Sequence, residues 1–571
     1  MRRHPVCCLR PVLPSGTRNI HISLDTRYVM NLDDACSLSI EHLAAHGPSD
    51  ITRESLETAL ILAHKAELIS EVRAKVRGGD VNGMGFKPVQ YILTPKNRYV
   101  FDYRKAAIID PLCLAKYTAI VLQAAKQIEG ARIPVSERIV FSARFAPNEG
   151  AIFDKNIGYG DWRERVKELA NDSSCKYVVQ CDIASFYDRI NIHRVESTLL
   201  SIGVDKQIVS ALNGLLLLWS KKDSYGIPVG NAASRIVAEA ALIDIDRYLI
   251  DEGVKFVRYV DDFRIFAPDL ITAQRWMNLL TTRLFRDGLM LNTGKTKLYL
   301  ASKDDEVAVN QPDDTPEAII KKVTKLTGGY NRVARTFIMP ASDKYDAFEK
   351  IDIPQEIEVL KATGIPEFSG IQKLIISCLV QQKFNLLEKV AILCGEYLYS
   401  LEYFVDMLLK NSDVIPLENK ENITSHYSQL VLSSGFGALE WHQATLAKLL
   451  SSEGYFRKAA LIHIVKAPAK DSVTYPSMIA LEGLRGHLTR EEFRTIREWF
   501  DRCDEWEKRR VISASIAMPE DERKAWGRAI KPMLQADFLA TKMAENLIRE
   551  LMSNLVYGGW SAGNEKAVAV S

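Results

Sequence analysis

The sequence has few cysteines, and none of them stands in a pattern that binds metal or forms a disulfide framework. The 571 residues include nine cysteines, an odd number, without a Cys-x-x-Cys pair. Such a set argues against structural zinc and against a disulfide-stabilised extracellular domain. It suits a reducing compartment, and we therefore expect a cytoplasmic protein.

Long hydrophobic runs are missing as well. No segment approaches the ~18 continuous apolar residues of a membrane span. The basic N-terminus "MRRHPVCCLRPVLPSG" is interrupted by Pro5, Arg10 and Pro11, so it lacks the apolar core of a signal peptide. We expect no membrane partner and a flexible N-terminal extension over residues 1–25.

Neither sign of charge dominates the chain. Lysine and arginine total 74 against 72 aspartates and glutamates, which gives a net charge of +2. No global field therefore favours a polyanionic partner, although local basic patches remain open. With 47% hydrophobic and 26% charged residues, the composition is that of a soluble globular protein of about two to four domains.

The hydrophobic patterns change along the chain. Residues 30–75 have apolar spacing typical of helices, residues 90–165 mix strands and a helix, and residues 175–300 are β-rich with helical crossovers. Beyond about residue 320 strands nearly vanish, and one helix follows another. These patterns predict an α+β fold followed by an all-α C-terminal domain.

The sequence of this C-terminal part predicts where several helices begin. Thr489-x-x-Glu492 and Asp504-x-x-Glu507 are typical of capping boxes, and Pro519 precedes an acidic first turn. The starts lie roughly 15 residues apart, as in an α-solenoid whose neighbouring helices bury each other's apolar faces. The alternative is a single irregular helical domain, since no crisp repeat is present.

Two adjacent aspartates interrupt the apolar stretch "FVRYVDDFRIFA". Strands are predicted on both sides of Asp261-Asp262, so the pair falls at the tip of a hairpin. Asp182 follows another strand-like segment, and if the two strands are neighbours the carboxylates converge into an oxygen-rich site for Mg²⁺. Two such ions suit an in-line phosphoryl displacement. An isolated Asp-Asp pair is more often an ordinary hairpin tip.

Two further features lie around this hairpin. Gly226 and Gly230 form a Gly/Pro-rich turn before a helix expected to begin near Asn231, where free backbone N–H groups favour an anion. Lys295 follows Gly288 in a position where its ammonium group would meet a triphosphate. The alternative interpretation of Lys295 is a solvated loop lysine.

In this order and at these separations, "CDIASFYDRI", "GIPVGNAASR", "YVDDF" and "GLMLNTGKTK" resemble motifs A, B, C and D of reverse transcriptases. The stretch "RYVFDYRKAAIIDPLCLAKYTAIV", with "ERIVFSARF" and "DWRERV" after it, further resembles the fingers of the bacterial "unknown group" and abortive-infection reverse transcriptases linked to phage defence. Those families often carry a HEAT-like α-repeat domain at the C-terminus.

The resemblance implies a right-hand fingers and palm unit, with N-terminal helices and fingers over 26–165, the palm with motifs A–D over 166–320 and an α-helical domain over 321–571. It implies two Mg²⁺ ions, with Mn²⁺ as an alternative. It also implies the following roles: catalytic carboxylates Asp182, Asp261 and Asp262; metal ligands Asp182, Asp261 and the backbone carbonyl of Ile183; nucleotide-binding residues Arg104, Lys105, Tyr187 (the steric gate), Gly230, Ser234, Arg235 and Lys295.

We therefore expect an RNA-directed DNA polymerase-like enzyme that uses dNTPs, makes DNA and acts in antiviral defence. Template-free or protein-primed synthesis is one mode. Templated synthesis on a bound non-coding RNA is the first alternative, and a non-catalytic sensor of nucleic acid or phage protein is the second. Homo-oligomerisation through the helical domain is expected, with Trp499, Trp506 and Trp526 as interface anchors or, alternatively, as core residues.

Overall fold

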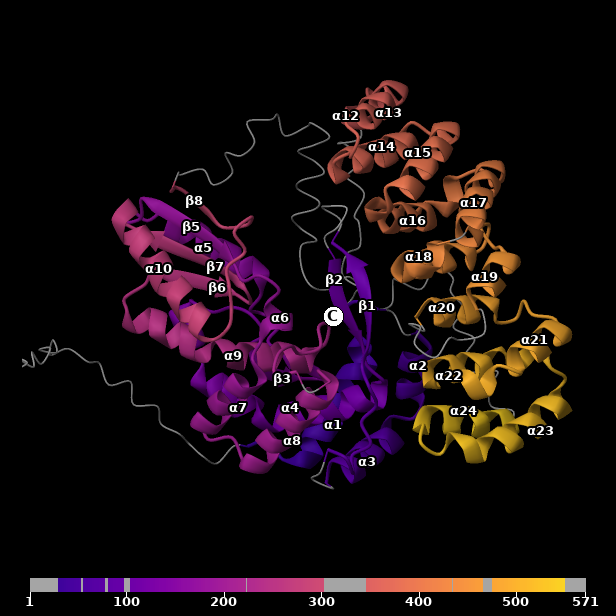
Figure 1. Cartoon of the computed structure of the whole chain (residues 1–571), viewed down its shortest axis with the longest axis horizontal. Helices are drawn as coiled ribbons and strands as arrows, with labels where there is room; N and C mark the ends of the chain where they lie inside the picture. The colour runs from indigo at the N-terminus through magenta and orange to yellow at the C-terminus, as the bar shows by residue number, and fades with distance from the viewer. Residues whose placement is uncertain are drawn as a thin grey trace, which may run out of the picture.

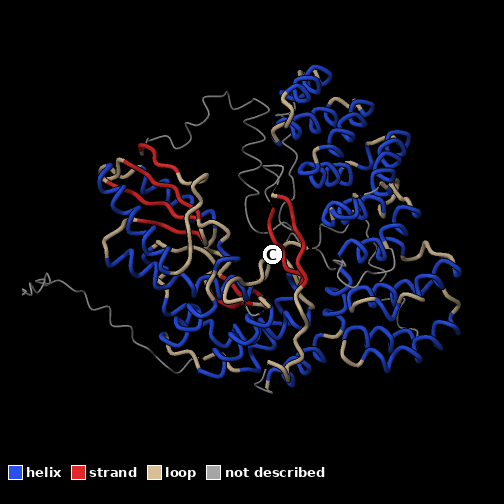
Figure 2. The backbone as a smooth tube through the Cα atoms, in the orientation of Figure 1, coloured by secondary structure: helices blue, strands red, loops and turns tan. Residues whose placement is uncertain are grey.

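Strands and helices alternate in the first part of the molecule, and only helices follow in the second (Figures 1 and 2). The computed structural model describes residues 29–301 and 346–549, with short gaps at 53–54, 78–80, 97–102, 222, 434 and 466–474. The α+β class with a helical C-terminal region is confirmed. Among the described residues, no helix combines the length and apolar character needed to span a bilayer.

A four-stranded antiparallel sheet, the palm sheet, forms the centre of the first part. Its order is β6-β7-β5-β8. The strands are rich in β-branched and aromatic residues, and the side chains of Val178, Val257, Phe263 and Ile265 are fully buried. The strand bounds are β5 (Tyr177–Asp182), β6 (Phe256–Tyr259), β7 (Asp262–Ala267) and β8 (Lys297–Leu300).

The hairpin that joins β6 to β7 has its tip one residue earlier than expected. Tyr259 pairs with Asp262, so the two tip residues are Val260 and Asp261, while Asp262 is the first residue of β7. Val260 has φ of 55°, a left-handed conformation that is unfavourable for a β-branched side chain. The prediction of both aspartates at the tip was therefore wrong for Asp262.

A second hairpin, β1 (Gln90–Pro95) with β2 (Tyr103–Ile108), leads into α4 (Pro111–Ala131). Asp110 caps α4, with its side chain accepting from the backbone N–H groups of Leu112 and Cys113, and proline occupies the first turn. Helix α4 is buried on nearly all sides because it packs against α1, α3, α8 and α9.

The remaining elements of the first part surround these two hairpins. They are α1 (Leu32–His46), α2 (Ser55–Ala63), α3 (Lys65–Val76), β3 (Phe145–Asn148), β4 (Ala151–Phe153), α5 (Tyr159–Ala170), α6 (Phe186–Arg189), α7 (Ile192–Ser201), α8 (Lys206–Trp219), α9 (Ala232–Asp251) and α10 (Leu270–Arg286).

The second part, the helical domain (residues 346–549), is a curved row of helices from α12 to α24 (Figure 1). Its helices are α12 (Asp346–Glu349), α13 (Ile353–Ala362), α14 (Phe368–Val380), α15 (Phe384–Glu396), α16 (Leu401–Lys410), α17 (Leu417–Leu432), α18 (Glu440–Leu450), α19 (Lys458–Ile464), α20 (Tyr475–Leu484), α21 (Arg490–Arg497), α22 (Glu505–Ala514), α23 (Glu520–Ile530) and α24 (Phe538–Arg549).

Helices in this row pack against close neighbours in the sequence: α14 against α15, α16 against α18, α18 against α20, and α20 against α22. This order agrees with the predicted solenoid-like array. Both capping boxes are present: the Thr489 and Asp504 side chains accept from the Glu492 and Glu507 backbone N–H groups, and both glutamates reach back. Local sequence therefore sets where these helices begin.

The three tryptophans proposed as interface anchors, Trp499, Trp506 and Trp526, lie inside the helical domain rather than on an exposed face. Trp506 is buried, and Trp526 packs edge-on against Phe493 and Phe500 with ring centroids 5.8 and 5.3 Å away. Trp499 is partly buried against the core. Core packing, the alternative interpretation, therefore describes these residues better than interface anchoring.

The predicted domain boundaries stay predictions. The boundary at residue 165 falls within α5, and the boundary at 320 lies outside the described residues, as does the extension over 1–25.

Candidate active site

The three aspartates singled out by the sequence meet at one end of the palm sheet. Asp182 is the last residue of β5 and pairs with Asp262, the first residue of β7. Asp261 precedes Asp262 at the hairpin tip, and its backbone carbonyl accepts from the Ile183 N–H at 3.1 Å. The antiparallel β5–β7 pairing thus brings together carboxylates from positions far apart in the sequence.

The electrostatics of this cluster are unbalanced. Burial, together with the neighbouring carboxylates of Asp182 and Asp262, raises the pKa of Asp261 to about 7. Burial also raises the pKa of Asp262, although Arg264, whose Nη1 lies 3.5 Å from Asp262 Oδ1, opposes this shift. Burial and neighbouring carboxylates therefore both disfavour the ionised form of Asp261.

Lys295 contacts this cluster directly. Its Nζ lies 2.9 Å from Asp182 Oδ2, and Asn292 Nδ2 donates to the same oxygen at 3.4 Å. The Asn292 backbone N–H also donates to the Asp182 carbonyl at 2.7 Å, which ties the loop before β8 to the end of β5. Lys295 is half exposed, but it is an ion-pair partner of Asp182 and not an isolated loop lysine.

The donor set fits a hard divalent cation. Carboxylate oxygens are the ligands that Mg²⁺ prefers, and a cation would offset the repulsion that raises the pKa of Asp261. In the described part of the chain, no three acidic, histidine or cysteine side chains already stand close enough to hold an ion. The lysine ammonium is the positive group that contacts Asp182 in this structure.

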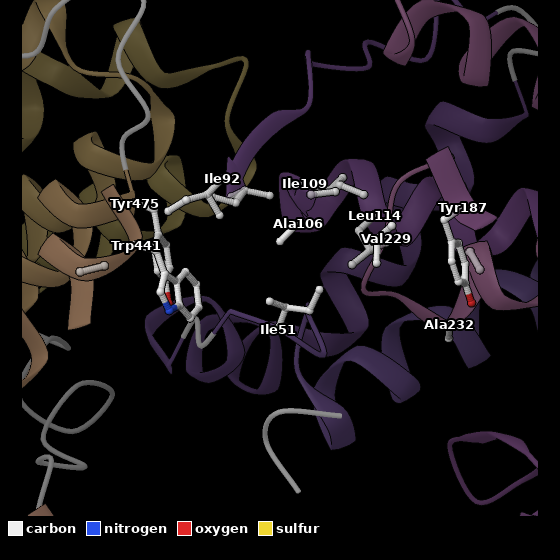
Figure 3. Close-up of a cluster of buried hydrophobic side chains, with 14 of the residues drawn as sticks. Ile51, Ile92, Ala106, Ile109, Leu114, Tyr187, Val229, Ala232, Trp441 and Tyr475 are labelled. Atoms are coloured by element: carbon white, nitrogen blue, oxygen red, sulfur yellow. The ribbon is translucent and has the colours of Figure 1, made fainter. Parts of the chain in front are cut away.

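Tyr187, the expected steric gate, follows the cluster at α6. Its side chain is buried, and burial raises the pKa of its phenol while the nearby Arg235 opposes that shift. The Tyr187 carbonyl accepts from the Ile227 N–H at 3.0 Å, which attaches α6 to the Gly/Pro-rich turn. In Figure 3 the Tyr187 ring lies beside the start of α9, near Ala232.

The Gly/Pro-rich turn has the geometry that the sequence suggested. Asn231 caps α9, accepting from the Ser234 N–H, so the helix begins where expected. Gly230 has φ of 103°, and a Cβ there would lie 2.9 Å from Ile51 Cδ1. The backbone conformation therefore favours glycine at this position, whereas the Ile51 side chain could shift to make space.

Ser234 and Arg235, which were expected to shape the nucleotide pocket, contact residues outside the carboxylate cluster, and their role stays a prediction. The Ser234 side chain is fully buried, and its hydroxyl lies 3.2 Å from the Tyr117 hydroxyl, so it belongs to the core between α4 and α9. Arg235 forms an ion pair with Asp50, in the loop after α1. Neither contact is with the carboxylate cluster.

Arg104 and Lys105 lie on opposite faces of the β1–β2 hairpin, because successive strand residues alternate. Lys105 Nζ stands 4.0 Å from the centre of the Tyr91 ring and lowers the pKa of Asp188, the residue after Tyr187, against the larger effect of burial. Arg104 shares the other face with Ala106. The two side chains therefore leave the hairpin on opposite faces, and their grip on a triphosphate stays a prediction.

Sequence reasoning missed the fully buried Arg258 of β6. Its guanidinium donates to the Val260 carbonyl at 2.9 Å, to Asp246 Oδ1 at 2.8 Å and to Glu239 Oε2 at 3.0 Å. Burial disfavours its charge, but Asp246 and Glu239 outweigh burial and raise its pKa. Arg258 thus holds the strained residue that presents Asp261. The sequence signal that could have identified Arg258 is a basic residue inside an otherwise apolar strand.

One family model matches this part of the chain. Residues 140–327 match the family described as "Reverse transcriptase (RNA-dependent DNA polymerase)". These residues include the palm sheet, the Gly/Pro-rich turn and all three aspartates. The chain therefore carries a reverse transcriptase domain, which is a nucleotidyltransferase domain.

Similarity to solved structures is weak. The chain aligns with telomerase from Candida albicans in complex with a TWJ fragment of telomeric RNA at 13% identity and a TM-score of 0.28, covering 63% of this chain and 66%, just under two thirds, of the other. It aligns with apo telomerase from Candida tropicalis at 12% identity and a TM-score of 0.29, covering 76% and 73%. Scores this low support no functional argument. No curated protein matches the chain.

Proposed function

We propose that the chain is a DNA polymerase that joins dNTPs by two-metal catalysis at Asp182, Asp261 and Asp262. The observation that carries this proposal is the convergence of three carboxylates, with a raised pKa at Asp261, inside a reverse transcriptase domain. Bound Mg²⁺ would activate the attacking hydroxyl and stabilise charge on the leaving pyrophosphate, and Mn²⁺ is the alternative ion.

The protein's own residues would bind and orient the reactants. Asp182 and Asp261, with the Ile183 carbonyl, are the proposed metal ligands, and Asp262 is an accessory carboxylate. Lys295 now contacts Asp182. If a cation bound Asp182 instead, the Lys295 ammonium group would be free to contact a triphosphate. The Lys105 side chain, on the hairpin face near Asp188, is better placed than Arg104 to meet the same anion.

The remaining pocket residues would select the nucleotide. The buried Tyr187 ring would exclude a ribose 2′-hydroxyl by its volume, and Gly230 would let the backbone approach the substrate closely. Ser234 and Arg235 would shape the pocket indirectly, through Tyr117 and Asp50 respectively.

The biological setting we propose is antiviral defence in the cytoplasm. It is supported by the resemblance of the fingers and motif-B sequences to defence-associated bacterial reverse transcriptases and by the helical domain that follows the palm.

We also propose that the enzyme forms a homo-oligomer through the helical domain. Truncation near residue 340, followed by light scattering and a phage-protection assay, tests this role; unchanged assembly and protection would contradict it.

The test of the polymerase is incorporation of radiolabelled dNTPs by the purified protein with Mg²⁺, with and without added RNA. We expect incorporation by the wild type, and none by Asp182→Asn. Asp251→Asn, an exposed carboxylate at the end of α9, is the matched control and should retain activity. A folded Asp182→Asn protein with wild-type incorporation would contradict the site, and an inactive wild type would favour the non-catalytic sensor.

The same assay separates two priming modes. A two-metal site needs only a positioned hydroxyl, so a tyrosine phenol can replace a 3′-hydroxyl. Label that migrates with the protein until protease treatment, and that resists ribonuclease pretreatment, indicates protein-primed, template-free synthesis. Label found only in free DNA, and only with RNA present, indicates the alternative, templated synthesis on a bound non-coding RNA.

A further inference from the structure

The β1–β2 hairpin lies between the palm and the helical domain (Figure 1). On one side the Ala107 N–H of β2 donates to the Val229 carbonyl, in the Gly/Pro-rich turn, at 3.4 Å. On the other side β1 contacts α18. A change in the position of the helical domain would therefore change the position of the hairpin that carries Arg104 and Lys105.

Helix α22 contacts the base of this hairpin, where β1 begins and β2 ends and where Gln90 pairs with Ile108. Gln90, the first residue of β1, donates from Nε2 to Oδ2 of Asp504, the N-cap of α22, at 2.7 Å. Asp110, two residues after β2 ends, accepts from Arg509 Nη2 at 2.6 Å. One helix thus anchors both strands of the hairpin at their paired base, from which Arg104 and Lys105 extend toward the tip.

The Arg509 contact belongs to a buried ion-pair cluster. The Arg509 guanidinium also donates to Asp537 Oδ2 at 3.0 Å and to Glu57 Oε1 at 3.3 Å, and Arg510 Nη2 donates to Glu57 Oε2 at 2.7 Å. Lys87 Nζ approaches Asp110 at 3.4 Å. All but the partly buried Lys87 are nearly inaccessible to water, so the docked arrangement is strongly specified.

An apolar contact extends this interface along the hairpin. Figure 3 draws Ile92 of β1 beside Trp441 and Tyr475 of the helical domain, and all three are buried. The two aromatic rings stack on each other with centroids 5.7 Å apart and an interplanar angle of 10°. The hairpin face that carries Ile92 and Ala106 is thus covered by rigid aromatic side chains.

We infer that the helical domain sets the position of the β1–β2 hairpin for nucleotide binding, with Arg509 and Asp504 of the α22 region as positioning residues. This inference rests on the proposed polymerase function, because the hairpin acts on the incoming dNTP. The helical domain is then part of the polymerase, in addition to any role in assembly.

Two substitutions in the full-length protein test it. Gln90→Ala removes one hydrogen bond at a partly buried position, and Arg509→Lys keeps the charge but loses the forked geometry that reaches three carboxylates. The matched control is Lys373→Ala, which removes an ion pair with Glu356 at the far end of the helical domain.

We expect the KM for dNTPs to rise about tenfold in both test variants, with kcat within about threefold of wild type, because only binding geometry is disturbed. Amide hydrogen exchange in β2 should accelerate by a similar factor, and the control should match wild type in both measurements.

An unchanged KM and unchanged β2 exchange would overturn the inference, as would a fall in kcat alone, which reports a smaller folded fraction. Gln90→Ala decides the matter if Arg509→Lys does not fold. If the wild type incorporates no dNTP, the proposed function fails, while β2 exchange still shows whether α22 holds the hairpin.

Discussion

Two regions of the molecule gather charged side chains, and they arrange them differently. In the cluster at α22, Arg509, Arg510 and Lys87 face Glu57, Asp110 and Asp537. At the end of the palm sheet, Asp182 pairs with Lys295, Asp262 pairs with Arg264, and Asp261 lies beside both carboxylates. Each of the three carboxylates in the first set contacts an arginine, and Lys87 and Arg510 also approach Glu505 and Glu482 at 3.6 and 3.7 Å. In the second set, by contrast, three carboxylates act on one another.

The pKa values express the same difference. At α22 burial would raise the pKa of Asp110, but Arg509 and Lys87 outweigh burial and hold it well below its usual range. In the palm, burial and the neighbouring carboxylates act together and raise the pKa of Asp261 to about 7. Carboxylates buried beside guanidinium groups hold structure together, whereas neighbouring carboxylates that raise one another's pKa are suited to bind a cation.

The largest expected effect breaks function while sparing structure. Asp261→Asn should lower dNTP incorporation by about 10³-fold or more, because the transition-state charge loses a metal ligand. Its unfolding midpoint should be no lower than that of wild type, since one repulsive charge is gone. Incorporation and urea unfolding are measured on the same preparation, with Asp251→Asn as control. A strongly destabilised Asp261→Asn protein would refute the distinction between the two clusters.

The second effect breaks structure. Glu57→Gln removes the main partner of Arg510 and should lower the free energy of unfolding by about 3–5 kcal/mol, because a buried charge is left uncompensated. The control is Glu522→Gln, which removes the exposed partner of Arg490 and should change stability by about 1 kcal/mol or less. Equal losses in urea unfolding would show that burial does not set the strength of these pairs.

A third effect concerns substrate choice beside the carboxylates. Tyr187→Ala should relax selection against ribonucleotides by about 10- to 200-fold, the range that a small group in a pocket accounts for. Tyr187→Phe, which keeps the ring, should retain selection. The measurement is the ratio of kcat/KM values for dNTP and rNTP. If Tyr187→Ala and wild type give the same ratio, Tyr187 is not the gate.

The last expected effect is a difference in pH dependence. Because the folded pKa of Asp261 lies near 7, above its ordinary value, the folded protein binds this proton more tightly than the unfolded chain. Stability from this group is complete at low pH and is lost as pH rises towards 7, by up to about 1.4 kcal/mol per pH unit.

Urea unfolding between pH 4 and 7 in a chelating buffer checks this slope. Wild type should lose stability relative to Asp261→Asn as pH rises through that window. Asp110, with its lowered pKa, acts in the opposite direction and only at lower pH. Parallel profiles for the two proteins would contradict the raised pKa of Asp261.

Much of the site was predictable because it depends on local rules. Alternation and turn chemistry predicted the hairpin around Asp261, and a cap predicted the start of α9 at Asn231. The four ordered motifs predicted the reverse transcriptase domain that the family model confirms. The roles assigned to individual residues stay predictions, to be decided by the variants above.

Other features escaped prediction for physical reasons. The hairpin tip begins at Val260 because the Arg258 guanidinium donates a hydrogen bond to the Val260 carbonyl. This bond stabilises a backbone conformation that valine rarely adopts. The inward direction of Ser234 follows from packing of α9 on α4. The opposite faces of Arg104 and Lys105, by contrast, follow from strand alternation and were open to prediction.

The sequence by itself determined the helix starts, the strands and the order of the motifs, because capping, alternation and turn preferences act between residues a few positions apart. Only the tertiary structure decided which charges meet. Arg509 and Glu57 are 452 positions apart, and Arg258 finds Glu239 on a different element. A buried charge is stable only beside a partner, and folding, which brings distant segments together, supplies that partner.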